Sequence, residues 1–347
     1  MRPLTVLVTA SGAPGTAALL RALRENGERE VRLVGCDMSA RSVGRFLCDA
    51  FATVPRGREP EFPDAVLELA LAEGADAVLP QSSHDLAGLA GARERFAASG
   101  VTVLVSAPET VALANDKAEC YRRLGEAGVR APAWRRVRGR SAFAAAAAEL
   151  GYPDRPVCFK PVFGSGSRGF RVLDPAVDRA HELLHERPGN LAMRVEEVVE
   201  LLDERRGDEL LVMELAEGGE RTIDGIADGR RVVLGHPKTR EGMRAGLAMF
   251  FRTLADDELM EQADRIVDAL GIEHFFNVQL VGELVIEVNP RISTVVYQED
   301  LNLPYLGVKR ALGEIRDEEL AAYASRARPT RRALRYFDQV EWDEEPA

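Results

Sequence analysis

The sequence predicts a mixed α/β and α+β protein, in which a small doubly wound domain precedes a larger part built from antiparallel hairpins. Three stretches support this prediction: a strand, glycine turn and helix at 4–23, and two hairpins at 156–173 and 276–291. A strand followed by a glycine turn and a helix is how a parallel α/β unit begins. Two apolar runs around a short glycine-containing turn form an antiparallel hairpin.

The N-terminal part alternates short apolar runs with helical patterns. Leu4 to Val8 is apolar enough for a strand buried on both faces, which is typical of a parallel sheet. Further strands are expected at 31–36, 77–80 and 101–105, with a helix at 62–73. This order predicts a doubly wound domain.

The turn from Thr9 to Thr16 leads into the first helix, whose free N-terminal amides can receive an anion. Gly12 and Gly15 lack the three-glycine spacing with which a backbone approaches a pyrophosphate, so a nicotinamide cofactor is disfavoured. Asp37 nevertheless follows the second strand, where a ribose-binding acid would lie. The remaining alternative is that the two glycines merely form the turn.

The hairpin at 156–173 contains a loop rich in glycine and serine after Lys160. The loop includes Gly164, Ser165, Gly166 and Ser167. Glycines let several backbone amides face a phosphate without Cβ clashes, and the lysine supplies a point charge. It is not a Walker loop, because no Gly-Lys-Ser/Thr follows and no helix opens there. We predict a flexible hairpin that closes over a nucleotide, with a plain mobile hairpin as the alternative.

Between the hairpins, a buried strand is expected at 210–213, ending at Glu214, and Glu220 follows a short turn. Such a strand end can offer amides and carbonyls to an adenine, and Glu220 could hold ribose hydroxyls. Considered alone, both acids would be solvated turn residues. Lys238 and Arg240 alternate on one side of an extended run. Other expected elements are a charged connector at 135–140, helices at 142–150 and 256–270, a strand at 232–235 and a surface strand within 329–347.

The hairpin at 276–291 is the stretch around which the functional interpretation is built. Its period of two places Gln279, Glu287 and Asn289 where they can share a face, and Arg291 follows at once. One carboxylate and side-chain amides suit Mg²⁺, which leaves the rest of its shell to waters and phosphates. Arg291 can meet a phosphate as a bidentate fork. A solvated hairpin face is the alternative.

Composition limits the function classes. The chain has 347 residues, 46% hydrophobic and 29% charged, as expected for a globular protein of two or three domains. A net charge of −11 without a basic stripe argues against nucleic-acid binding. The four cysteines form no Cys-x-x-Cys pair, and no run of about 18 apolar residues or secretion signal is present. We therefore expect a cytoplasmic location and no membrane partner.

Taken together and in this order, these pieces resemble the ATP-grasp superfamily, in the branch of the carbamoyl-phosphate synthase large subunit and biotin carboxylase. The resemblance covers essentially the whole chain. It implies a Rossmann-like pre-ATP-grasp domain at 1–115, an ATP-grasp domain at 116–325 with a small lobe at about 130–212 and a large lobe at about 213–325, and a C-terminal strand with an acidic tail at 326–347.

The resemblance also implies roles for individual residues. Glu287, Asn289 and Gln279 would bind Mg²⁺, which Mn²⁺ could replace. ATP would be bound by Lys117, Lys160, the glycine hairpin, Glu214, Leu215, Ala216 and Glu220. The transferred phosphoryl group would face Arg291, Lys238 and Arg240. The substrate would be contacted by Ser11, Gly12, Arg244 and Ser293.

The reaction implied is ATP-dependent formation of a C–N bond between a small-molecule carboxylate and an amine, through an acyl phosphate, with release of ADP and phosphate. Such transfer depends on positioning and charge neutralisation rather than on a protein nucleophile. Ser293 and Thr294 follow Arg291 without a match to the carboxylases' bicarbonate and base motif. An ATP-dependent carboxylase of the biotin carboxylase type and a non-catalytic ATP-binding module are the alternatives, and a homodimer is compatible with the family.

Overall fold

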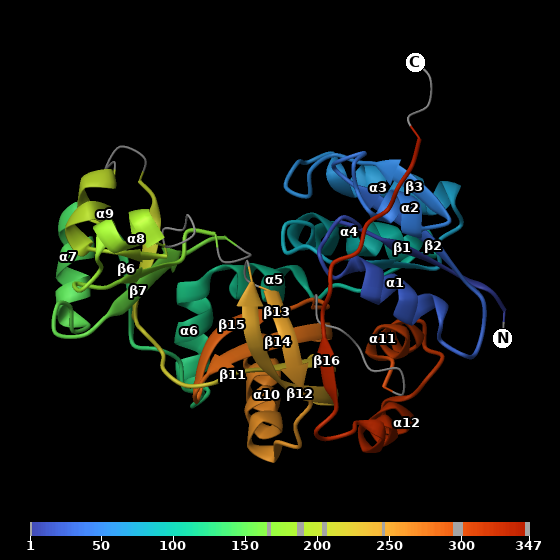
Figure 1. Ribbon diagram of the computed structural model, residues 1–347. Coiled ribbons are helices and arrows are strands. Elements are labelled where there is room, and N and C mark those ends of the chain that lie inside the picture. The colour runs from blue at the N-terminus through green and yellow to red at the C-terminus, as the bar shows by residue number, and fades with distance from the viewer. Residues whose placement is uncertain are drawn as a thin grey trace. The chain divides into compact units, whose positions relative to one another are not determined.

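The computed structural model describes residues 2–164, 168–185, 191–202, 207–244, 247–293 and 301–343. Its chain forms two compact units, whose helices and strands are labelled in Figure 1. Unit 1 comprises Met1–Ala112, Glu220–Gln279 and Val288–Ala347, and unit 2 comprises Leu113–Gly219 and Leu280–Glu287. In the parts of the chain described, no helix has the length and apolar character needed to cross a membrane.

The N-terminal sheet is parallel and has the predicted doubly wound arrangement. Its strand order is β3-β2-β1-β4-β5. The strands are β1 (Leu4–Val8), β2 (Val31–Asp37), β3 (Ala50–Thr53), β4 (Ala77–Leu79) and β5 (Thr102–Val103), and the helices are α1 (Thr16–Arg24), α2 (Gly44–Leu47), α3 (Phe62–Ala72), α4 (Leu86–Ala98) and α5 (Pro108–Asn115). The order reverses between β1 and β4, so a crevice is expected at their carboxyl ends.

Apolar side chains on both faces explain this sheet. Val6 of β1 packs with Leu19 of α1, whereas Leu7 packs on the other face with α3 and α4. Successive strand residues point to opposite faces, so a strand that is apolar throughout must be covered on both sides. The continuous apolar run in the sequence therefore predicted this layer correctly.

The sheet of unit 2 has the order β6-β10-β7-β8-β9. Its strands are β6 (Trp134–Arg138), β7 (Val157–Pro161), β8 (Arg171–Leu173), β9 (Ala192–Met193) and β10 (Glu209–Glu214), and the helices of this unit are α6 (Lys117–Glu126), α7 (Arg140–Glu149), α8 (Arg179–His185) and α9 (Val195–Leu201). Phe159 of β7 meets Phe143 of α7 edge to face, with ring centroids 5.1 Å apart. Alternation then turns Lys160 to the opposite face of the sheet.

The expected connector at 135–140 is wrong, because most of it is strand β6. This strand pairs with β10 in antiparallel register, from Glu209↔Arg138 to Met213↔Trp134. Arg136 donates to Glu209 Oε2 at 2.5 Å across the two strands. Charged side chains are common on edge strands, where they also discourage pairing with other chains. The charged composition of this segment is typical of a loop, but pairing with β10, which is distant in the sequence, makes it a strand.

The third sheet has the order β15-β14-β11-β12-β13-β16. Its strands are β11 (Glu220–Asp228), β12 (Val232–Arg244), β13 (Leu247–Arg252), β14 (Glu273–Val281), β15 (Leu284–Asn289) and β16 (Arg332–Leu334), accompanied by α10 (Asp257–Leu270), α11 (Leu303–Ala311), α12 (Asp317–Ala321) and η1 (Ala322–Arg326). The predicted helix begins with Asp256 accepting from Leu259 N and ends at the left-handed Gly271. Gly282, with φ of 57°, forms the predicted turn between β14 and β15.

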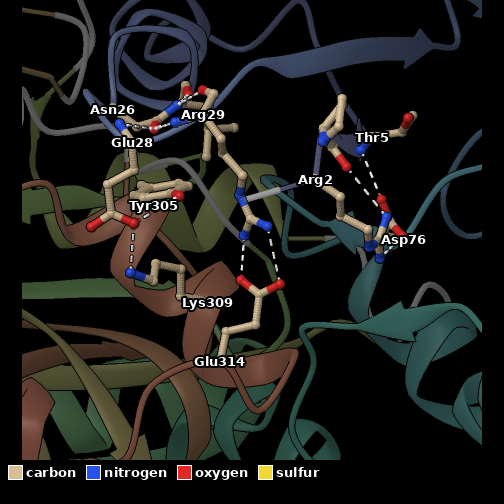
Figure 2. Close-up of polar contacts among 11 residues, drawn as sticks. Arg2, Thr5, Asn26, Glu28, Arg29, Asp76, Tyr305, Lys309 and Glu314 are labelled. Carbon is tan, nitrogen blue, oxygen red and sulfur yellow. Dashed lines mark hydrogen bonds and ion pairs between the residues drawn. The ribbon is translucent and has the colours of Figure 1, made fainter.

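A partly buried ion pair connects the N-terminal domain to the loop after α11 (Figure 2). The Arg29 side chain is 1% exposed, and both of its terminal nitrogens donate to the carboxylate of Glu314. Beside it, Lys309 Nζ donates to Glu28 Oε2 at 2.6 Å, and Tyr305 donates to the same oxygen at 3.2 Å. Unit 1 is therefore held together by polar contacts as well as by its apolar core.

Replacing Glu314 by Gln should destabilise unit 1, because the Arg29 guanidinium would stay buried without its counter-charge. We expect a loss of about 1 to 2 kcal/mol in the free energy of unfolding, less than for a fully buried pair because the Glu314 side chain is 25% exposed. Denaturant unfolding measures this loss. Glu318→Gln, a change at an exposed helix position, is the control and should stay within about 0.5 kcal/mol of the unaltered protein. Equal effects of the two variants would contradict the prediction.

Candidate functional site

One face of the third sheet carries a connected row of polar side chains, with the amide of Asn277 at its centre. Asn277 Nδ2 donates to Asp224 Oδ1 at 3.0 Å and to Thr222 Oγ1 at 2.8 Å. Its Oδ1 accepts from Gln279 Nε2 at 3.0 Å and from Asn289 Nδ2 at 3.3 Å. Each end of the amide is thus used, and three neighbouring strands contribute to one network.

The two cations of β12 face the same network. Lys238 Nζ lies 3.0 Å from Asp224 Oδ2, with side chains 0% and 1% exposed. Arg240 Nη1 donates to Gln279 Oε1 at 2.5 Å and lies 3.1 Å from Glu220 Oε2. The structure therefore brings both predicted cations to the face that carries Gln279. A buried charge requires such a counter-charge, since desolvation is otherwise costly.

Arg291 connects this face to the N-terminal domain. Its Nε donates to Ser83 Oγ at 2.9 Å, and its Nη2 donates to Asn289 Oδ1 at 3.4 Å. Ser83 lies in the loop after β4, at the point where the strand order of the parallel sheet reverses. The crevice expected at that point is therefore next to the guanidinium predicted to face the phosphoryl group.

A small polar pocket opens on the same face, with a volume of about 50 Å³. Such a volume holds one or a few waters, or a small polar group of a ligand. The described residues that line it are Arg240, Ala248, Asn277, Gln279, Arg291, Ser293 and Arg335. Of the predicted substrate residues, the structure places Ser293 here.

The other predicted substrate residues lie elsewhere in unit 1. Ser11 is buried at the end of β1, with its Oγ 3.4 Å from the hydroxyl of Ser42. Gly12 N donates to Asp37 Oδ2 at 2.8 Å, so Asp37 closes the turn. Arg244 ends β12, and its guanidinium lies 4.9 Å from the centroid of the Phe337 ring.

Unit 2 carries the two predicted phosphate-binding lysines. Lys160 Nζ donates to the Tyr121 hydroxyl at 3.1 Å and to the carbonyl of Ile286 at 2.9 Å. Lys117 Nζ donates to the carbonyl of Gly164 at 2.6 Å. The predicted loop residues Ser165, Gly166 and Ser167 lie outside the described residues.

Both lysines are held in an environment that disfavours their charge. Burial lowers the pKa of Lys160 to about 8, although the nearby Glu287 carboxylate opposes the shift. Burial also lowers the pKa of Lys117, again opposed by Glu287. Opposite charges favour ionisation, so an arriving phosphate would restore full protonation of these amines.

The predicted adenine contacts follow β10. The carboxylate of Glu214 accepts from Ala133 N at 3.0 Å, and Leu215 and Ala216 are half-buried in the segment that follows. Glu220, the predicted ribose contact, begins β11 and is the carboxylate paired with Arg240.

The predicted Mg²⁺ ligands are compatible with a hard cation that is completed by phosphates and water. Among the described residues, no group of three or more His, Cys, Asp or Glu side chains converges on a metal position. Gln279 and Asn289 lie in one network, in which their amide nitrogens donate to Asn277 and their amide oxygens accept from Arg240 and Arg291. Glu287 precedes Asn289 by two residues in β15, on the same side of the strand. One carboxylate with amide oxygens fits Mg²⁺, which completes its coordination with waters and phosphates. The set is too small for a site in which the protein supplies every ligand.

Two residues of this region were missed in the sequence. Asn277 lies two residues before Gln279, so the same alternation that identified Gln279 could have found it. The sequence around Arg335 contains no motif that points to the pocket, because Arg335 is distant in the sequence from the other residues that line it.

Comparison with known families agrees with this geometry. Residues 206–332 match the family described as ATP-grasp in the biosynthetic pathway with Ter operon. The chain contains an ATP-grasp domain. Ahead of the ATP-grasp domain, residues 6–104 match the PylC-like N-terminal domain. The resemblance to ATP-grasp proteins seen in the sequence is thereby confirmed.

Individual relatives fall in the expected branch. The carbamoyl phosphate synthase large chain of Kocuria rhizophila is 28% identical over 218 residues, covering 57% of this chain and 18% of the relative. The chain spans about a fifth of the length of the curated relatives it matches. Biotin carboxylase of Campylobacter jejuni, solved as a β,γ-ATP complex, has the same fold, with a TM-score of 0.64, 19% identity and coverage of 91% of this chain and 72% of that one.

L-amino acid ligase from Bacillus licheniformis also shares the fold. Its TM-score is 0.62 at 16% identity, over 96% of this chain and 79% of that chain. The fold predicted from the sequence, an N-terminal α/β domain followed by an ATP-grasp fold, is therefore confirmed.

The pKa of Lys160 predicts how stability depends on pH. Its value is about 8 in the folded protein against 10.5 for an ordinary lysine, so between these values the unfolded chain binds more protons. The free energy of unfolding should then rise with pH across this window, and Lys160→Met should lack that rise. Denaturant unfolding of both proteins at several pH values from 7 to 10.5 measures the difference. Parallel profiles would contradict the lowered pKa.

Proposed function

We propose that this protein is an ATP- and Mg²⁺-dependent ligase that joins a small-molecule carboxylate to an amine through an acyl phosphate, releasing ADP and phosphate. The observation that carries the proposal is the Asn277-centred face, in which Gln279, Asn289, Arg240 and Arg291 converge within an ATP-grasp domain. Amide oxygens for a cation and guanidinium groups for a phosphoryl group lie in one network. That combination suits phosphoryl transfer, which requires charge neutralisation and alignment.

The charged residues of the site would have different roles. Lys117 and Lys160 would bind ATP phosphates, and the lowered pKa of each lysine means that phosphate binding would be coupled to proton uptake, for Lys160 near and above its pKa of about 8. Arg291 and Arg240 would stabilise negative charge on the transferring group. Lys238, buried against Asp224, would act by fixing the carboxylate that orients Asn277.

Magnesium would be held by Glu287, Asn289 and Gln279, and it would supply neutralisation of the phosphate oxygens; Mn²⁺ could take its place. The named relatives support this class of chemistry, since a carbamoyl phosphate synthase and an L-amino acid ligase are among them. We also propose a cytoplasmic enzyme with small-molecule partners. Carboxylation is the second candidate, because a biotin carboxylase shares the fold equally well.

The deciding experiment measures ADP, AMP and phosphate released from Mg-ATP against amino acids and small carboxylates, singly and in pairs, with mass spectrometry of the products. We expect ADP and phosphate only with a particular pair, and a product lighter than the sum of the two by one water. ADP release that needs bicarbonate as the carboxylate would indicate a carboxylase. AMP with pyrophosphate would contradict the acyl phosphate.

Glu287→Gln and Lys160→Ala should each lower the turnover rate by at least about 100-fold, because each removes charge that acts on the phosphates. Glu283→Gln is the matched control, since this carboxylate lies in the same hairpin but is exposed and paired with Arg130. The control should keep its rate within about threefold. Full activity of either site variant would contradict the assignment of these residues.

Asn277→Ala should raise the Mg²⁺ concentration that gives half-maximal activity by about 10- to 100-fold, the usual effect of removing a group that orients metal ligands. The change leaves Gln279 and Asn289 in place but removes the oxygen to which both donate. A magnesium titration at saturating ATP measures the effect. An unchanged magnesium requirement in a variant that still unfolds cooperatively would show that Asn277 does not orient the ligands.

A further inference from the structure

Three arginines reach the small pocket from separate parts of unit 1. Arg240 comes from β12, Arg291 from the segment after β15, and Arg335 from the segment after β16. The first two belong to the proposed phosphoryl-transfer machinery. Arg335 does not, and it also lies beyond the residues that match the ATP-grasp family model, which end at 332. Its position in the pocket therefore has no role so far.

The backbone holds Arg335 firmly at this place. Strand β16 pairs with β13 in the register Phe250↔Leu334, and one residue later Arg335 N donates to Met249 O at 2.7 Å. Alternation along the strand sends Leu334 outward, where it is 69% exposed, and Arg335 to the other side. The pairing of β16 at the edge of the sheet is visible in Figure 1.

Two aromatic contacts fix the chain that continues from β16. The Phe337 ring lies beneath the Arg244 guanidinium, and the Trp342 ring packs on Phe46 with centroids 4.8 Å apart. The segment is therefore anchored on both sides of Arg335, by strand pairing before it and by ring contacts after it. An anchored guanidinium loses little conformational entropy when it binds a ligand.

The described side chains that line the pocket include groups that bind anions. Of the described residues that line it, three are arginines and none is acidic. Glu220, just outside, offsets the charge of Arg240. A guanidinium is a planar fork that matches a carboxylate in two parallel hydrogen bonds. A pocket of about 50 Å³ is large enough for a group of that size.

We propose that Arg335 binds a carboxylate that does not react, so that one of the two substrates carries a carboxylate in addition to the group that forms the new bond. This inference rests on the proposed ligase function. Arg291 and Arg240 act on the transferring phosphoryl group, and Arg335 sets specificity beside them. An amino acid used as the amine substrate has the required chemistry, because its carboxylate remains free when its amino group is acylated.

The test compares Arg335→Gln with Arg332→Gln, an exposed arginine of β16 whose side chain lies on the opposite side of the chain from that of Arg335. Each variant is assayed with the amino acids that support product formation and with their amides, which lack the carboxylate. For Arg335→Gln we expect the KM of the amino acid to rise by about 10- to 100-fold, the range for a lost hydrogen bond to a charged group. The KM of ATP, and the KM of the amide, should match those of Arg332→Gln.

A binding measurement without turnover separates the two proposals. The amino acids and their amides are tested for a shift of the melting temperature of each variant in the absence of ATP. A carboxylate-dependent shift that Arg335→Gln loses and Arg332→Gln keeps supports the pocket assignment, even if no pair yields ADP and the ligase proposal fails. Identical behaviour of the two variants, or no carboxylate-dependent shift in the unaltered protein, overturns the assignment.

Discussion

The amide of Asn277 is the group on which the polar face of the third sheet depends. A carboxamide presents donors at one end and an acceptor at the other, so it can satisfy an aspartate and a glutamine side chain at the same time. Here its nitrogen donates to Asp224 and Thr222, and its oxygen accepts from Gln279 and Asn289. Asn277 is only 3% exposed, so a change to an apolar side chain would leave several buried polar groups unsatisfied. Four neighbouring side chains are therefore linked through this one group.

The charges around that network are arranged so that desolvation is offset before any ligand arrives. Lys238 is balanced by Asp224, and Arg240 by Glu220. In unit 2 the balance is incomplete, because burial outweighs the attraction of Glu287 and the pKa of Lys160 falls to about 8. An anionic ligand would therefore gain the most electrostatic binding energy beside Lys160, where the protein's own counter-charge is weakest. This difference between the two groups of cations is consistent with phosphates as the ligand of the lysines.

The N-terminal domain contacts the rest of unit 1 through two arginine side chains. Ser83, at the point where the strand order of the parallel sheet reverses, accepts a hydrogen bond from Arg291. Arg29, buried against Glu314, fastens the domain to the segment that follows α11 (Figure 2). In the proposed function, the N-terminal domain would therefore position a guanidinium of the site, and substrate recognition would involve both parts of unit 1.

Local pattern determined much of this protein. Apolar runs specified the parallel sheet, and alternation with Gly282 at the turn specified the hairpin that carries Gln279 and Asn289, because side-chain direction in a strand repeats every two residues. Composition alone gave a wrong prediction at 135–140. The segment is charged like a connector, but most of it is a strand because it pairs with β10. Only the tertiary structure decided that Asn277 joins Asp224 and that Arg335 enters the pocket. Both depend on strands that are distant in the chain and adjacent in the sheet, and a contact of that kind leaves no trace in the local order of residues.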